Sequence, residues 1–358
     1  MTNERMQLWQ RLLEHGVVSE AIPAEEIGGS PWYVKFLLGL GGWVAAIFMF
    51  GFIVLSLELV INDTAIAALL GLVMMAIAYK LLSLKGEHEF VGQLLLATSF
   101  AGQGLLVFSL LDNTSFRNTT IWFAIAILQS ALAWFMPNSF HRVWSAFAAA
   151  TALSIGFTFS GIYFIPSSLL LLVVALLWLN EHTWPQYHRR VLPIAYGATI
   201  ALIYQATTQI FYKEIIWDIF YYRQNMAMGF KPWMGEVLCS VVLIFVVWQL
   251  LARYRVAIPG RFAHIVLAGS LLLSLASLKA PGISVGLVII LLGFANGNRI
   301  VAGMGIASLL FYISSYYYQL QTTLLLKSQT LFVIGIILIL ARWLMHVGIH
   351  RNRGSAHE

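Results

Sequence analysis

Long apolar segments alternate with short polar loops along almost the whole chain. A helix needs about 20 mostly apolar residues to cross a bilayer, because the hydrocarbon core is about 30 Å thick and a helix rises about 1.5 Å per residue. The pattern therefore predicts an all-α polytopic membrane bundle of about twelve transmembrane helices. These helices are expected near residues 36–61, 65–84, 90–111, 121–136, 142–159, 164–180, 191–211, 233–252, 262–278, 282–294, 300–318 and 328–347.

The predicted transmembrane domain covers residues 36–348. It follows an amphipathic segment at residues 1–35 and precedes a basic tail at residues 349–358. Six predicted helices on each side of the loop at 181–190 permit two parallel halves, 36–180 and 191–348. No internal sequence repeat supports that division.

The basic residues favour cytoplasmic termini. With twelve helices, both termini lie on one side of the membrane. Placing that side in the cytoplasm puts fifteen of the 21 Lys and Arg residues inside and the other six outside, as the positive-inside rule requires. The net charge of +6 is then explained by topology and by contact with anionic headgroups. No basic stripe with interleaved aromatic residues indicates nucleic-acid binding.

Composition supports the membrane assignment and gives little chemistry. Hydrophobic residues make up 60% of the 358 positions and charged residues 10%, against about 25% charged in an ordinary soluble domain. No zinc-protease, phosphate-loop, dinucleotide or serine-hydrolase motif occurs, so no cofactor or metal is expected and an enzyme is not favoured. The lone Cys239 excludes an intrachain disulfide.

Charged side chains near the predicted outer ends of helices form one candidate site. Charges in lipid are costly, so two acids and two bases at one depth suggest a polar vestibule or a headgroup site. Ordinary interfacial charges are the alternative, because each lies within about one turn of a helix end and can reach water. The four residues are Glu58, Glu236, Lys279 and Lys327.

Aromatic residues on the same side form a candidate partner surface. Trp and Tyr favour the headgroup region, so a structural belt is the alternative. The residues lie in or beside the outer loop at 213–232, which is expected to hold an interfacial helix, and at the end of the eleventh helix. They are Trp217, Tyr221, Tyr222, Tyr316, Tyr317 and Tyr318.

Amide side chains at membrane depth form a third set: Gln103, Gln205 and Gln209. Gln205 and Gln209 are four residues apart and so share a helix face. Hydrogen bonds between helices are the usual role of such residues, and a solute path is the alternative.

Several motifs resemble one family. They are GFANGNR at 293–299, YYYQL at 316–320, LLLKS at 324–328, PWYV at 31–34, LGLGGW at 38–43 and AGQGLL at 101–106. The chain resembles a family of uncharacterised multi-spanning bacterial inner-membrane proteins, a domain of unknown function, whose members are typically encoded beside a small membrane protein with a GDYxxLxY motif. The resemblance implies an inner-membrane location and that small partner, and it supplies no catalytic residues. In physical terms, Asn296–Arg299 predicts a tight inner-face turn in which Gly and Asn suit positive φ.

Three functions are compatible with these observations. A scaffold or subunit of a cell-envelope complex, acting with the small partner, is favoured. A secondary transporter or lipid-handling protein is the alternative, and a membrane-embedded enzyme is the weakest of the three. A water-accessible cavity at the midplane would favour transport, whereas a filled bundle with an exposed apolar groove would favour the scaffold.

Overall fold

A computed structural model describes residues 63–84, 89–112, 116–162, 165–181, 183, 185–217, 232–256, 260–278 and 280–319, with isolated positions between 11 and 51 and between 325 and 339. Regular structure within these ranges is helical and includes no strand. The elements are α4 (Thr64–Leu82), α5 (Glu89–Asp112), α6 (Thr119–Phe135), α7 (Ser139–Phe159), α8 (Ile165–Leu179), η1 (Pro185–Tyr187), α9 (His188–Trp217), α10 (Pro232–Arg253), α11 (Arg261–Ser277), α12 (Ile283–Ala295) and α13 (Arg299–Gln319).

The helices α4 to α13 each fall on a predicted transmembrane segment. Among the described residues, five helical stretches are long and apolar enough to cross a membrane: Thr64–Leu82, Phe90–Asp112, Pro185–Phe211, Trp233–Arg253 and Arg299–Tyr318. The first and last predicted segments, 36–61 and 328–347, lie almost entirely outside the described residues. The count of twelve and the cytoplasmic termini therefore stay predictions.

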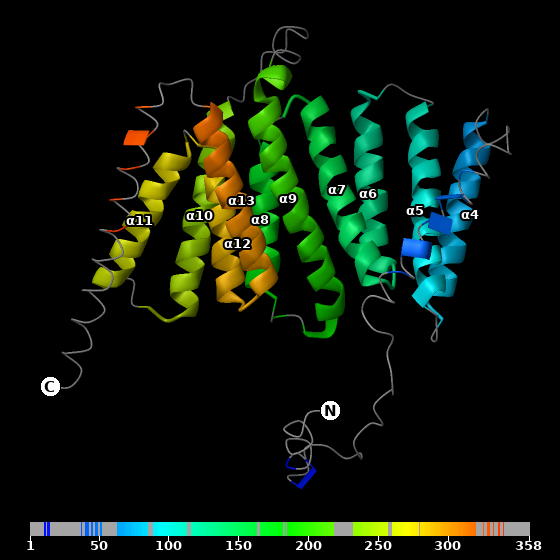
Figure 1. The fold of residues 1–358 in the computed structure, drawn as a ribbon, viewed down its shortest axis with the longest axis horizontal. Coiled ribbons are helices and arrows are strands. Elements are labelled where there is room, and N and C mark those ends of the chain that lie inside the picture. The colour runs from blue at the N-terminus through cyan, green and yellow to red at the C-terminus, as the bar shows by residue number, and fades with distance from the viewer. Residues whose placement is uncertain are drawn as a thin grey trace. The chain divides into compact units, whose positions relative to one another are not determined.

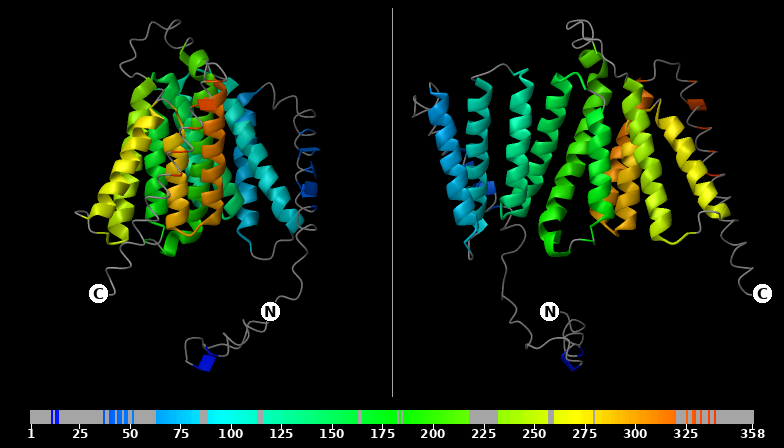
Figure 2. Two further views of the ribbon diagram at one scale, coloured as in Figure 1. Left: turned by 60° about the vertical axis from the view of Figure 1, so that its left-hand side comes forward. Right: turned by 180° about the vertical axis from the view of Figure 1, so that it is seen from behind.

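Local sequence explains where several helices begin. The side chain of Asp63 accepts hydrogen bonds from the backbone N–H groups of Ala65 and Ile66, and Asn118 and Asn138 cap α6 and α7 in the same way. Asp and Asn are favoured here because their side chains satisfy N–H groups that the first helical turn leaves without partners. Short loops then make sequential helices antiparallel, as Figures 1 and 2 show for α6 to α9.

The described helices expose apolar side chains on their outward faces. In α4, only 28% of the most apolar stretch is buried, and Leu69 is 63% exposed. Similar outward residues occur on other helices, among them Ile127 in α6 and Leu272 in α11, at 72% and 68% exposed. A helix that is apolar on all sides and only partly buried suits lipid rather than water.

The chain divides into two compact units, residues 1–115 and 116–358. In the first, α4 and α5 pack closely at Gly71 and Gly102, where a Cβ on Gly71 would lie 2.5 Å from the main-chain oxygen of Gly102. Ser109 in α5 donates a 2.6 Å hydrogen bond to the main-chain oxygen of Thr64 in α4. Small residues thus allow the close backbone approach that stabilises helix pairs in lipid.

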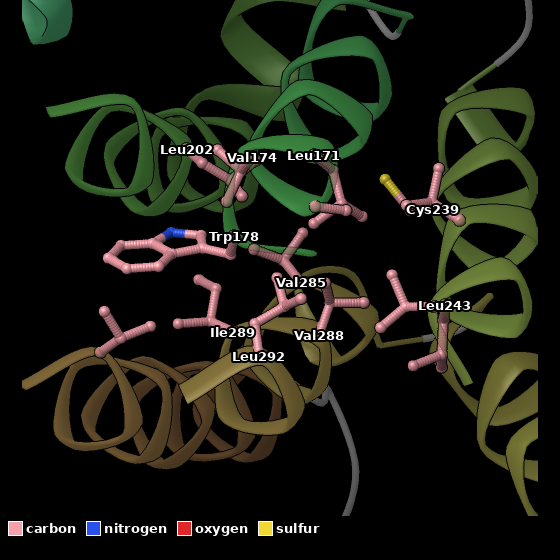
Figure 3. Packing of buried hydrophobic residues seen from close by; sticks show 14 of the residues in the cluster. Leu171, Val174, Trp178, Leu202, Cys239, Leu243, Val285, Val288, Ile289 and Leu292 are labelled. Carbon is pink, nitrogen blue, oxygen red and sulfur yellow. The ribbon is translucent and has the colours of Figure 1, made fainter. Parts of the chain in front are cut away.

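The second unit has a continuous apolar core that joins α8 to α9, α10 and α12 (Figure 3). Trp178 of α8 is 1% exposed, and Leu243 of α10 and Leu292 of α12 pack in the same cluster. This core contains helices from both sides of the loop at 181–190, which separates the two predicted halves in the sequence. The division into halves stays a prediction.

The helix α9 is longer than the predicted segment 191–211. It begins at His188 and continues to Trp217, so the backbone of residues 213–217 extends a transmembrane-type helix. The rest of the predicted outer loop, 218–231, lies outside the described residues.

Candidate functional site

The turn between α12 and α13, which we call the Asn-Gly-Asn turn (Asn296–Asn298), has the predicted backbone geometry: Gly297 has a φ of 63°. Asn296 donates a 2.7 Å hydrogen bond to the main-chain oxygen of Trp178 at the end of α8. Its side-chain oxygen accepts from Arg253 at the end of α10, at 3.2 Å. One side chain therefore joins the ends of three helices.

Asn298 makes a second set of contacts. Its side-chain nitrogen donates to the hydroxyl of Tyr196 in α9 at 2.6 Å, and its side-chain oxygen accepts from the backbone N–H groups of Ile300 and Val301 at 3.1 and 3.2 Å. It thus caps α13 and binds α9 at once. The family-like motif around 293–299 therefore encodes a structural junction.

Trp178 extends this junction into the core. Its indole N–H donates to Thr199 Oγ1 at 3.0 Å, and its ring meets that of Tyr196 edge to face, with 5.2 Å between centroids. A buried Trp requires a partner for its N–H, which Thr199 supplies. The junction fixes α8 against α9 at the end where α10, α12 and α13 also meet.

A pocket of about 680 Å³ lies between α6, α7, α8 and α9, and we call it the α6–α9 pocket. Its lining is apolar except for Ser130 and Ser154. Phe123 and Phe157 line one end, with ring centroids 5.4 Å apart. Trp134, eleven residues along α6 from Phe123, lies at the other end. The pocket suits a hydrophobic ligand rather than a polar solute.

Basic and aromatic residues gather at the Trp134 end. The guanidinium of Arg190 lies 5.7 Å from the centre of the Trp134 ring, and the Tyr187 ring lies 5.8 Å from it. Arg142 is buried and donates to the main-chain oxygens of Met136 at 2.6 Å and Arg189 at 3.0 Å. Within the described part of the chain, no carboxylate pairs with Arg142 or Arg190.

The predicted amide residues lie between helices. Gln205 of α9 is buried and donates to the main-chain oxygen of Ala150 in α7, while Gln209 donates to Ser167 Oγ in α8, each at 3.2 Å. Gln103 is buried in α5. These contacts are those of residues that hold helices together, and a solute path stays a prediction.

The predicted outer-face charge cluster is described only at Glu236, which is half-buried early in α10. Glu58, Lys279 and Lys327 lie outside the residues whose side chains the structure describes. The cluster stays a prediction.

The aromatic partner surface is described at its α13 end. Tyr316 and Tyr317 are half-buried, whereas Tyr318 is 79% exposed. Trp217 is the last residue of α9, and its side chain lies outside the description, as do Tyr221 and Tyr222. A partner-binding role for these residues stays a prediction.

The α6–α9 pocket and the basic residues at its Trp134 end were not predicted from the sequence. Arg142 and Arg190 entered the sequence prediction only among the fifteen Lys and Arg residues that favour cytoplasmic termini. A signal was present, because basic residues recur close to Trp134 and Tyr187 at one predicted membrane interface. The pocket itself has no sequence signature, since its walls are ordinary apolar helix residues.

The described fold defines a class, the all-helical proteins with several helices of membrane-spanning length and composition. Residues 31–346 match the model of a family described as "Domain of unknown function (DUF4401)", so the chain belongs to that family. No curated protein and no solved structure matches it. The expected membership of an uncharacterised family is confirmed.

Proposed function

We propose that the chain is a non-catalytic subunit or scaffold of a cell-envelope complex in a bacterial inner membrane, acting with a small membrane protein of the GDYxxLxY type. The observation that carries this proposal is that polar side chains of the described helices and turns form hydrogen bonds to neighbouring helices. Gln205, Gln209, Asn296 and Asn298 each bind a neighbouring helix. Such groups hold a rigid framework together.

Exposed apolar and aromatic residues give the scaffold its means of contact. Tyr318 at the end of α13 is 79% exposed beside Tyr317, whose ring centroid lies 5.7 Å away. Exposed aromatic side chains supply much contact area at a small entropic cost, which suits a partner surface. The small partner is expected to bind there.

A lipid-handling role is the second candidate, and the α6–α9 pocket favours it. The pocket is apolar and falls within the size range of small-molecule sites, about 300–1,000 Å³. A secondary transporter of polar solutes has no comparable support in the described residues.

Purification of the tagged full-length chain from its native membranes in mild detergent tests the proposal. A small membrane protein present in stoichiometric amount supports the scaffold role if Tyr318→Ala releases it and Leu272→Ala, a change at a position of α11 that is 68% exposed, does not. A folded chain that elutes alone under conditions that preserve other membrane complexes would contradict the proposal.

A further inference from the structure

We propose that the α6–α9 pocket binds one acyl chain of an anionic phospholipid, with the lipid phosphate at Arg190 beside Trp134. This site is independent of the scaffold role. It is inferred from the length, lining, opening and charge of the pocket.

The length of the pocket matches one leaflet. Its walls on α6 run from Phe123 to Trp134, eleven residues further along the helix, which corresponds to about 16 Å at about 1.5 Å per residue. Half of a hydrocarbon core about 30 Å thick is about 15 Å. A chain that begins at the headgroup level at Trp134 would therefore end near the aromatic pair Phe123 and Phe157.

The lining of the pocket suits an acyl chain. Ser130 and Ser154 are its two polar lining residues, and the other residues that line it are apolar.

The pocket also opens towards the surrounding medium. Ile127, Leu169 and Val173 belong to its lining and are 72%, 43% and 41% exposed. A bilayer lipid can therefore enter from the side, without passing through water.

Charge at one end of the pocket selects the headgroup. Arg190 is exposed and lies over Trp134, which itself lines the pocket. The positive charge of Arg142 lies close enough to repel that of Arg190, and no carboxylate pairs with Arg142 among the described residues. Two positive charges without acidic partners attract a phosphate, and Arg forms strong hydrogen bonds to phosphate oxygens. Trp134 and Tyr187 suit the headgroup level.

Native mass spectrometry of the full chain in nanodiscs tests this site, with equimolar phosphatidylglycerol and phosphatidylcholine of identical acyl chains. We expect retained phosphatidylglycerol to exceed phosphatidylcholine. Arg190→Gln should reduce that preference about fivefold, the factor for one basic residue at a lipid surface. The neighbouring change Arg189→Gln should preserve the preference for phosphatidylglycerol, because Arg189 binds Arg142 through its main-chain oxygen.

A second pair of variants tests the acyl chain. Ser130 is exposed and lines the pocket, so Ser130→Trp should fill it and abolish retention of both lipids. Ala131 is exposed on the same helix outside the pocket lining, so Ala131→Trp should behave as the parent chain.

Three results would overturn the proposal. One is a phosphatidylglycerol preference unchanged in Arg190→Gln. The other is equal retention in Ser130→Trp and Ala131→Trp. The third is displacement of a bound membrane protein by Ser130→Trp with lipid retention intact, which would show that the occupant is a protein segment. Helical content and unfolding midpoint of each variant confirm that it is folded, and Arg190→Gln alters only an exposed side chain.

Discussion

The guanidinium of Arg142 donates a 3.0 Å hydrogen bond to the main-chain oxygen of Arg189, which Pro193 leaves without its regular helical donor. In an α-helix this oxygen would accept from the N–H of residue 193, and proline has none. Arg142 also binds the main-chain oxygen of Met136, just after α6. One buried side chain therefore supplies a donor to a main-chain oxygen at the start of α9 and joins this helix to the end of α6.

This relationship predicts coupling between Arg142 and Pro193. Arg142→Met should lower the free energy of unfolding by about 2 kcal/mol, because two carbonyls lose a charged donor. In a Pro193→Ala background the new N–H can bind the Arg189 oxygen, so the same change should cost about 1 kcal/mol less. Unfolding by sodium dodecyl sulfate in mixed micelles measures all four chains of this cycle.

The control for this cycle is Arg189→Met, which keeps the accepting main-chain oxygen and should change stability little. Strictly additive effects of Arg142→Met and Pro193→Ala on the free energy of unfolding would show that the hydrogen bond from Arg142 to the Arg189 main-chain oxygen does not stabilise the fold.

Hydropathy placed the described helices well because lipid thickness sets the length of an apolar segment. The prediction 164–180 and the observed α8, Ile165–Leu179, differ by one residue at each end. The hydropathy prediction was wrong at the end of α9, which continues through Lys213 and Glu214 to Trp217. Charged residues end an apolar segment, but they do not end a helix, since Lys and Glu are good helix formers.

The candidate sites show a different limit. The tight turn at Gly297 was predictable, because Gly and Asn between two apolar segments indicate positive φ. Its partners were not, since Asn296 binds Trp178, 118 residues away, and Asn298 binds Tyr196, 102 residues away. Periodicity within one helix does not show which helix lies beside it.

Two glycines on α5 provide a matched test of helix packing. A Cβ on Gly102 would lie 2.7 Å from the main-chain oxygen of Gly71, whereas a Cβ on Gly104 would meet no atom within 4 Å. We expect Gly102→Ala to destabilise the chain by about 1–3 kcal/mol, the usual cost of overpacking. Gly104→Ala should be neutral or stabilise it by up to about 1 kcal/mol, through helix propensity. If Gly102→Ala and Gly104→Ala shift the unfolding midpoint in the same direction, the result would contradict the close approach of α4 and α5.

Substitutions at Asn298 should separate its two roles. Asn298→Ala removes the cap of α13 and the bond to Tyr196, and should cost about 2 kcal/mol. Asn298→Ser retains a capping oxygen, so it should cost about 1 kcal/mol, and Tyr196→Phe should add little to it because the bond is already lost. Equal unfolding free energies for the Ser and Ala variants would show that the cap contributes nothing.

Gly297 tests whether the turn itself limits stability. Its φ of 63° is left-handed, yet a Cβ there would meet no surrounding atom within 4 Å, so any cost of substitution arises between the new side chain and the local backbone. Gly297→Val should therefore lose about 1–2 kcal/mol, whereas Gly297→Asn should lose less, because Asn adopts this conformation more readily. The hydrogen bonds of Asn296 and Asn298 depend on the same turn, so the Val variant should also loosen α13. Faster amide hydrogen exchange at Ile300 and Val301 in the Val variant, and not in the Asn variant, is the expected result. Equal exchange in both would mean that neighbouring helices hold α13 without the turn.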